Sequence, residues 1–108
     1  MRSEYKAMWL VVMFDLPVTT KKARQDYTQF RRSLLADGFT MLQYSVYARY
    51  CESEDDAAKH RRRVRGSLPP AGQVRIVSIT DRQFGKMEIY SAFLHQAPEN
   101  APEQMQFL

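Results

Sequence analysis

Residues 8–14 read Met-Trp-Leu-Val-Val-Met-Phe, and the fold is best approached from this unbroken apolar run. A run that is apolar at every position predicts a strand buried on both faces. Because Pro17 cannot donate to a strand ladder, we expect the strand to stop near Leu16. The run falls short of the roughly 20 apolar residues that a membrane span needs, and no small-residue cleavage site follows it. We therefore expect a cytoplasmic protein with no membrane partner.

The segment that follows has the apolar periodicity of a helix. Its apolar residues recur at Ala23, Tyr27, Phe30 and Leu34. Thr19 or Thr20 offers an N-cap for this helix, and Asp37-Gly38 supplies a C-terminal stop. The pattern predicts strand, loop and helix as the first unit of the chain.

Residues 39–80 predict two further strands, a second helix and another strand. Residues 39–51 are rich in Tyr, Val, Thr and Phe and predict two short strands hinged near Tyr44 and Ser45. Ser53 caps a second expected helix that ends at Gly66, and residues 74–80 form a further strand. The order β-α-β-β-α-β predicts an α+β fold of the ferredoxin-like type, a four-stranded antiparallel sheet with both helices on one face.

One apolar segment has no place in that fold. Residues 84–93 are apolar enough to form an additional C-terminal strand, which we expect to pair across a homodimer by adding to an edge of the partner's sheet. The expected interface residues are Phe84, Met87, Ile89 and Tyr90. We interpret residues 1–94 as a single domain and residues 95–108, which contain two prolines, as a flexible tail.

Composition narrows the function classes. The 108 residues suit one domain, and 16 Lys and Arg against 12 Asp and Glu give a charge of +4 that favours a polyanion partner. A single cysteine, Cys51, excludes an intrachain disulfide and indicates a reducing compartment. We expect Cys51 to serve in packing, and His60 and His95 to be surface residues, because no set of zinc ligands is present.

Asp15 is the candidate for catalysis and for metal binding. It ends the buried strand just before a proline-containing loop, and Mg²⁺ needs only one or two carboxylates when phosphate and water supply its other ligands. A two-fold axis nearby would bring a second Asp15 to the same ion. The alternative is a structural carboxylate that bonds to the backbone at a strand end, and the pattern alone favours this alternative.

Two basic clusters are candidates for binding nucleic acid. The first lies on the first expected helix and consists of Lys21, Lys22, Arg24, Arg31 and Arg32. The second ends the second helix and includes Arg61, Arg62, Arg63 and Arg65. A basic helix face can follow a phosphate backbone, or it can simply be a solvated surface. We favour a phosphate contact at the second cluster, because the helix dipole accounts for only one or two of its four arginines.

Three tyrosines could suggest a sheet on which bases stack. However, the segment around Tyr44, Tyr47 and Tyr50 lacks the small residues that let bases approach the aromatic rings of such a sheet. We therefore expect these tyrosines to serve in core and interface packing. The chain also lacks a P-loop, a nucleophile elbow and an HExxH motif, so any catalysis would use a carboxylate and a metal.

Several blocks in order resemble one known family. Residues 12–17 (Val-Met-Phe-Asp-Leu-Pro) resemble the first-strand signature of CRISPR-associated protein two. Residues 37–47 (Asp-Gly-Phe-Thr-Met-Leu-Gln-Tyr-Ser-Val-Tyr) look like its second block, and residues 68–70, 74–76 and 79–85 look like its third. The similarity covers roughly residues 8–90, and the joint occurrence of the blocks is more specific than any one of them. The first helix is most similar to members from type II systems.

The resemblance implies a homodimeric scaffold in CRISPR adaptation. In the family, two subunits bridge dimers of the integrase, CRISPR-associated protein one, and hold double-stranded pre-spacer DNA on their basic surface. The family's Mg²⁺ ligand falls on Asp15, and nuclease activity on RNA or DNA is attributed to some members. The alternative function is therefore a Mg²⁺-dependent endonuclease that uses a symmetric Asp15 pair. A ferredoxin-like interaction domain without a nucleic-acid role is the third hypothesis.

Overall fold

The computed structural model describes residues 6–92 and 94–100 and confirms the predicted order β-α-β-β-α-β as far as Thr80. The elements are β1 (Met8–Asp15), α1 (Lys21–Ala36), β2 (Thr40–Gln43), β3 (Val46–Cys51), α2 (Glu54–Arg65), β4 (Gln73–Thr80), α3 (Asp81–Gly85), β5 (Ile89–Ser91) and β6 (Leu94–Gln96). The main sheet has the order β2-β3-β1-β4, and every neighbouring pair is antiparallel. This is the predicted α+β arrangement and is compatible with a ferredoxin-like fold.

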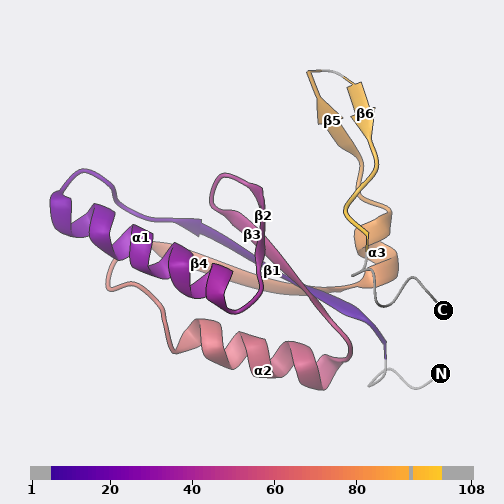
Figure 1. The fold of residues 1–108 in the computed structure, drawn as a ribbon, viewed down its shortest axis with the longest axis horizontal. Helices are drawn as coiled ribbons and strands as arrows, with labels where there is room; N and C mark the ends of the chain where they lie inside the picture. Colours follow the sequence, from indigo (N-terminus) through magenta and orange to yellow (C-terminus); the bar gives the residue numbers. More distant parts are fainter. Residues whose placement is uncertain (1–5, 93, 101–108) are drawn as a thin grey trace.

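The double-sided burial of β1 explains its continuous apolar run. Alternate side chains of a strand point to opposite faces, so Leu10, Val12 and Phe14 lie on the face covered by α1 and α2 (Figure 1). The helices contribute Phe30, Leu34, Ala57 and Val64 to this core. Trp9 and Val11 pack on the opposite face, where they belong to a second apolar cluster. The main sheet therefore has one face covered by two helices and a second apolar face.

The ends of both helices follow the expected capping rules. The Thr20 hydroxyl accepts a hydrogen bond from the Ala23 amide at the start of α1, and the Ser53 hydroxyl accepts one from the Asp56 amide at the start of α2. After α1 the chain turns through Gly38, whose φ of +87° lies in the left-handed region that glycine tolerates. These contacts fix the entry and exit of the two basic helices.

The prediction of one strand over residues 84–93 is confirmed only in part, because β5 (Ile89–Ser91) lies within this segment but its first residues belong to a helix. Thr80 and Gln83 form a capping box that starts α3 directly after β4. Phe84 lies in this helix and is fully buried, with its ring stacked on Trp9 at a centroid distance of 4.0 Å. The capping signal determines the local structure here, and the apolar residues serve to dock α3 on the sheet.

The last described elements form a hairpin. Strands β5 and β6 pair only with each other in an antiparallel ladder, and Figure 1 shows the hairpin standing away from the main sheet. Regular structure thus extends to Gln96, slightly past the residue at which we expected a flexible tail to begin. Residues 93 and 101–108, which belong to the predicted strand and tail, lie outside the described residues. Within the described ranges, no helix combines the length and the apolar composition that a membrane crossing requires.

Candidate nucleic-acid interface

The basic residues of α1 line a shallow groove on the exposed side of the helix. All five predicted cations of this helix are exposed. A hollow of about 450 Å³ is lined by Lys21, Arg24, Gln25, Thr28, Gln29 and Arg32. The cations that line this groove are therefore Lys21, Arg24 and Arg32, and Arg31 is not among them. The neutral amides and hydroxyl between the cations are hydrogen-bonding groups of the kind that contact phosphate oxygens.

Two of the five cations in α1 make contacts of their own. Lys22 forms a surface ion pair with Asp26 at 2.6 Å, and one guanidinium nitrogen of Arg24 donates to the carbonyl of Val18 at 3.2 Å. An exposed ion pair of this kind contributes little to stability. The positive charge of α1 consequently faces solvent almost undiminished.

The arginines of α2 divide into two groups. Arg61 donates to the Ser78 hydroxyl of β4, and Arg63 donates to the Asp37 carboxylate at 2.8 Å. Arg62 and Arg65 are exposed, and neither makes a side-chain hydrogen bond or ion pair with any residue in the described ranges. Arg65 also lines a groove of about 420 Å³ between the end of α2 and β4. The cluster thus offers two cations rather than four to a ligand.

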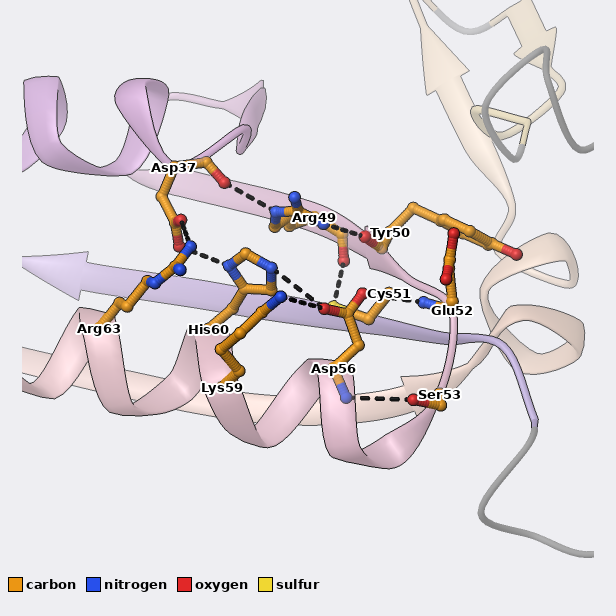
Figure 2. Close-up of polar contacts among 10 residues, drawn as sticks. All are labelled: Asp37, Arg49, Tyr50, Cys51, Glu52, Ser53, Asp56, Lys59, His60 and Arg63. Carbon is orange, nitrogen blue, oxygen red and sulfur yellow. Dashed lines mark hydrogen bonds and ion pairs between the residues drawn. The ribbon is translucent and has the colours of Figure 1, made fainter.

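Arg63 belongs to a polar network that fastens α1 to α2 (Figure 2). At its centre lies His60, whose side chain is only 2% exposed. Its Nδ1 lies 2.7 Å from Asp37 Oδ2, and its Nε2 lies 3.3 Å from Asp56 Oδ1. The expectation that His60 is a surface residue is wrong. The spacing of Ala57, His60 and Val64, which form the buried face of α2, is the sequence signal that reveals its position.

The network also holds the C-terminal end of α1. The Asp37 carbonyl accepts a hydrogen bond from Arg49 Nε at 2.7 Å, and Arg49 donates a second bond to the Tyr50 carbonyl, also at 2.7 Å. Because Arg49 extends from β3, the helix end is fixed to both the sheet and α2. Asp37 is therefore more than the helix stop that the sequence predicts.

The two carboxylates of the network are stabilised in their charged form. Burial by itself would raise the pKa of Asp37, but the hydrogen bonds from His60 and Arg63 outweigh burial and hold the pKa below its usual value. Burial also acts to raise the pKa of Asp56, and there the Glu52 amide and the Lys59 side chain reverse the effect. Both aspartates are ionised at neutral pH and neutralise nearby basic groups of α2.

Asp15 lies exposed at the end of β1 on a rigid backbone. Its strand register pairs it with Gln73 of β4, and the preceding Phe14 amide donates to the Ser45 carbonyl at 3.0 Å. Gly72 approaches so closely that a Cβ at that position would lie 2.6 Å from the Asp15 carbonyl oxygen. A side chain at residue 72 would displace this strand end, so the glycine fixes where the Asp15 carboxylate is presented.

Within the described residues of one chain, Asp15 is not part of any group of three metal-ligating side chains. A single carboxylate fits Mg²⁺, which keeps most of its waters and accepts phosphate oxygens as ligands. It does not fit zinc, which requires three or four protein ligands. Cys51 is also unsuited to zinc binding or nucleophilic chemistry, because it is buried as predicted and its pKa is raised, mainly by burial, to about 11.

The expected interface residues have different surroundings. Phe84 is enclosed within its own chain, and Met87 packs against the same apolar cluster as Trp9. Ile89 is half-buried, whereas Tyr90 is 62% exposed. Tyr90 is therefore the member of this set with the most surface left for a partner.

The three tyrosines that we expected to serve in core and interface packing differ in their exposure. Tyr47 is fully buried and Tyr50 is half-buried, as expected for packing, but Tyr44 is 75% exposed. Tyr44 occupies the turn between β2 and β3, just before Ser45, whose φ of +63° is left-handed. A turn hinged at this position was predicted, and the exposure of its tyrosine follows from the turn rather than from the strands.

The family model and the relatives that match this chain carry the same family name. A family model described as CRISPR associated protein Cas2 matches residues 8–87. A relative from Parvibaculum lavamentivorans named CRISPR-associated endoribonuclease Cas2 is 48% identical over 99 residues, which cover 92% of this chain and 98% of the relative. A relative of the same name from Flavobacterium psychrophilum is 46% identical over 82% of this chain and 76% of its own length. Another from Paracidovorax avenae is 42% identical over 96% of both chains.

Proposed function

Because this chain belongs to the CRISPR-associated Cas2 family, we propose that it is a homodimeric scaffold of CRISPR adaptation that grips the phosphates of double-stranded pre-spacer DNA and bridges integrase dimers. The observation that carries the proposal is the groove of α1, where Lys21, Arg24 and Arg32 lie on one exposed helix face. Cations spaced along a rigid helix neutralise successive phosphates and release counterions, and such contacts require no particular base sequence.

The test measures duplex binding as a function of salt. In the variant R24E/R32E the slope of log K against log salt should fall by about 2, and affinity should fall at every salt concentration. The matched control is R82E/K86E, which makes the same change of charge on and next to α3 and should keep a slope closer to that of the wild-type protein. Binding that is insensitive to salt, or equal losses in both variants, would contradict a phosphate grip on α1.

Dimerisation is supported by the surface that the helices leave open. The sheet face with Trp9 and Val11 also exposes Val77, which is 43% exposed on β4. The β5–β6 hairpin is a two-stranded ladder, and such ladders are marginal in water unless another surface covers them. From the resemblance to the family, we infer that a second copy of the chain covers this surface and that its sheet pairs with the C-terminal strand.

Sedimentation tests the dimer. The variant Val77→Lys places a charge on the open sheet face and should shift the protein towards monomer. Leu68→Lys introduces the same charge at a residue of similar exposure, 48%, in the loop after α2, and should leave the dimer unchanged. A monomeric wild-type protein would remove this part of the proposal.

The second candidate function is a Mg²⁺-dependent endonuclease that acts on RNA or DNA. It is favoured by the name endoribonuclease, which the curated relatives carry, and by the rigid presentation of Asp15 at the end of β1. In this function Asp15, paired with its copy across the dimer, would hold the ion, and Mg²⁺ when bound would supply charge stabilisation at the phosphodiester.

Asp15→Asn separates the two functions, because it removes a hard anionic ligand while keeping the side-chain shape. Under the nuclease proposal the variant loses Mg²⁺-dependent cleavage of a labelled RNA or DNA strand. Under the scaffold proposal it binds duplex DNA with unchanged affinity and supports spacer acquisition. Equal cleavage by the wild-type protein and the variant would assign the activity to something other than Asp15.

A further inference from the structure

The most exposed large hydrophobic side chain on the described surface is an aromatic ring held in a fixed orientation. Tyr44, at the tip of the β2–β3 turn, is 75% exposed. Its ring stacks on that of Tyr27 in α1, with centroids 5.9 Å apart and planes inclined by 20°. One face of Tyr44 is thus supported by Tyr27, which accounts for its orientation but leaves most of the ring in solvent.

The support continues into the core. Tyr27 packs edge-on against Phe14 at 5.8 Å, and its hydroxyl makes a 3.2 Å hydrogen bond with the Ser45 hydroxyl. Phe14 in turn stacks on the fully buried Tyr47. Four aromatic rings therefore run from the centre of the molecule to the surface and end at Tyr44. Such a series of contacts restricts the motion of the terminal ring before any ligand arrives.

The backbone of the β2–β3 turn is also held in place, at Ser45, the residue after Tyr44. Ser45 adopts a left-handed conformation, with a φ of +63°, that residues other than glycine rarely use. The Phe14 amide holds the Ser45 carbonyl at 3.0 Å, so the strand that carries Asp15 passes directly beside the turn that carries Tyr44. The turn that carries Tyr44 is thereby fixed to the end of β1.

The charges around the ring suit a nucleotide. On α1, Arg24 and Arg31 lie three residues before and four residues after Tyr27, so both are neighbours of Tyr27 on the helix surface, and both are exposed. The Tyr27 side chain raises the pKa of the Tyr44 hydroxyl, first through hydrogen bonding and then through charge. A tyrosine phenol is neutral at physiological pH in any case and does not repel phosphate.

We propose that Tyr44 is a stacking platform for an unpaired nucleobase, with the phosphates of the same strand lying beside Arg24 and Arg31. The inference rests on the proposed nucleic-acid function and adds a preference within it. Bases inside a duplex are already stacked on both faces, so the ring is open to an unpaired base but not to an interior base pair. The chemical class recognised is therefore nucleic acid with at least one unpaired base.

The test uses two oligonucleotides of equal length that carry 2-aminopurine, one single-stranded and one a blunt duplex. Stacking on Tyr44 should change the fluorescence of the single strand, and Tyr44→Ala should abolish this change and weaken single-strand binding about 5-fold or more. Tyr44→Phe keeps the ring and should retain binding within about 2-fold. Tyr44→Leu keeps apolar bulk without a ring and should behave like Tyr44→Ala.

A control and the duplex arm complete the test. Leu35→Ala truncates a 41% exposed apolar residue of α1 outside the platform and should leave single-strand binding unchanged. If Tyr44→Leu binds like the wild-type protein, or Tyr44→Ala weakens both oligonucleotides equally, the platform is refuted. If the wild-type protein binds the single strand through Tyr44 but does not bind the duplex, the scaffold proposal fails and the platform stands.

Discussion

The two long helices carry their positive charge at opposite ends of the helix dipole. Helix α1 begins with Lys21 and Lys22 and has no acidic residue in its first turn. Helix α2 has three acidic residues in its first turn and three arginines in its last turn. Because the N-terminal end of a helix dipole is positive, the charges of α2 stabilise their helix and the lysines of α1 destabilise theirs.

This difference indicates which charges serve a ligand. The arginines of α2 have reasons within the fold, since Arg61 and Arg63 hold Ser78 and Asp37, and the helix dipole favours positive charge in the last turn of the helix. Of the two lysines at the start of α1, Lys22 pairs with Asp26 at the surface, whereas Lys21 makes no ion pair with a described residue and opposes the helix dipole. The denser cluster in the sequence is therefore the less available cluster on the surface, and an outside anion is the better account of α1 than of α2.

The largest expected effect comes from removing the contact that fastens the two helices. Asp37→Ala leaves the buried His60 and the exposed Arg63 without the carboxylate that they share. The variant should lower the free energy of unfolding by about 3 kcal/mol, because His60 loses its partner inside the protein. Asp26→Ala removes the same side chain from α1 where it makes only a surface pair, and should cost less than about 1 kcal/mol. Urea unfolding followed by circular dichroism measures both values, and equal losses would refute a structural role for the network.

The same network predicts a response to acid. The pKa of Asp37 and of Asp56 is lower in the folded chain than in the unfolded chain, so protonation favours unfolding. Their contribution is fully present above the unfolded pKa of about 4 and is lost as pH falls through the folded values. Urea midpoints between pH 7 and pH 3 should fall steeply below about pH 4 in wild-type protein and less in Asp37→Ala. Parallel curves for the two proteins would contradict the assignment.

The fold could largely be predicted from the sequence because its signals are local. The apolar run of residues 8–14, the cap at Thr20 and the stop at Gly38 each act within a few residues. The predictions failed where distant partners decide the outcome. The spacing of Ala57, His60 and Val64 places His60 on the buried face of α2, but its partner Asp37 comes from the end of α1, 23 residues away in the sequence, and nothing in the local sequence indicates that partner.

The candidate site could be predicted by residue type but not by availability. All predicted cations are present on α1 and α2. Arg62 and Arg63 are both exposed, and the ion pair with Asp37 is what distinguishes Arg63 from Arg62. The same holds for Tyr44, whose residue type suggested packing and whose turn leaves it exposed. Asp15 is placed at the strand end as expected, and its role in metal binding stays a prediction.

A paired comparison within α2 tests availability directly. The variant R62A/R65A removes two exposed cations and should weaken duplex binding about 10-fold near 100 mM salt, with a decrease of about 2 in the salt slope. The variant R61A/R63A removes the same charge from residues already engaged within the chain and should change affinity about 2-fold or less. Fluorescence anisotropy on variants confirmed to be folded provides the measurement. A larger loss for R61A/R63A would show that these internal contacts open when DNA binds.

The smallest effect gives the sharpest contrast between the two helices. Lys21→Glu replaces a cation at the positive end of the α1 dipole and should stabilise the protein by about 0.5 kcal/mol, while Arg65→Glu at the other end of α2 should destabilise it by a similar amount. Both variants should weaken duplex binding, because both lose an exposed cation. If Lys21→Glu raises and Arg65→Glu lowers the stability to thermal unfolding while both variants weaken duplex binding, then Lys21 binds a ligand at a cost to the stability of α1. If Lys21→Glu is also destabilising, then Lys21 has a structural role and the contrast between the helices fails.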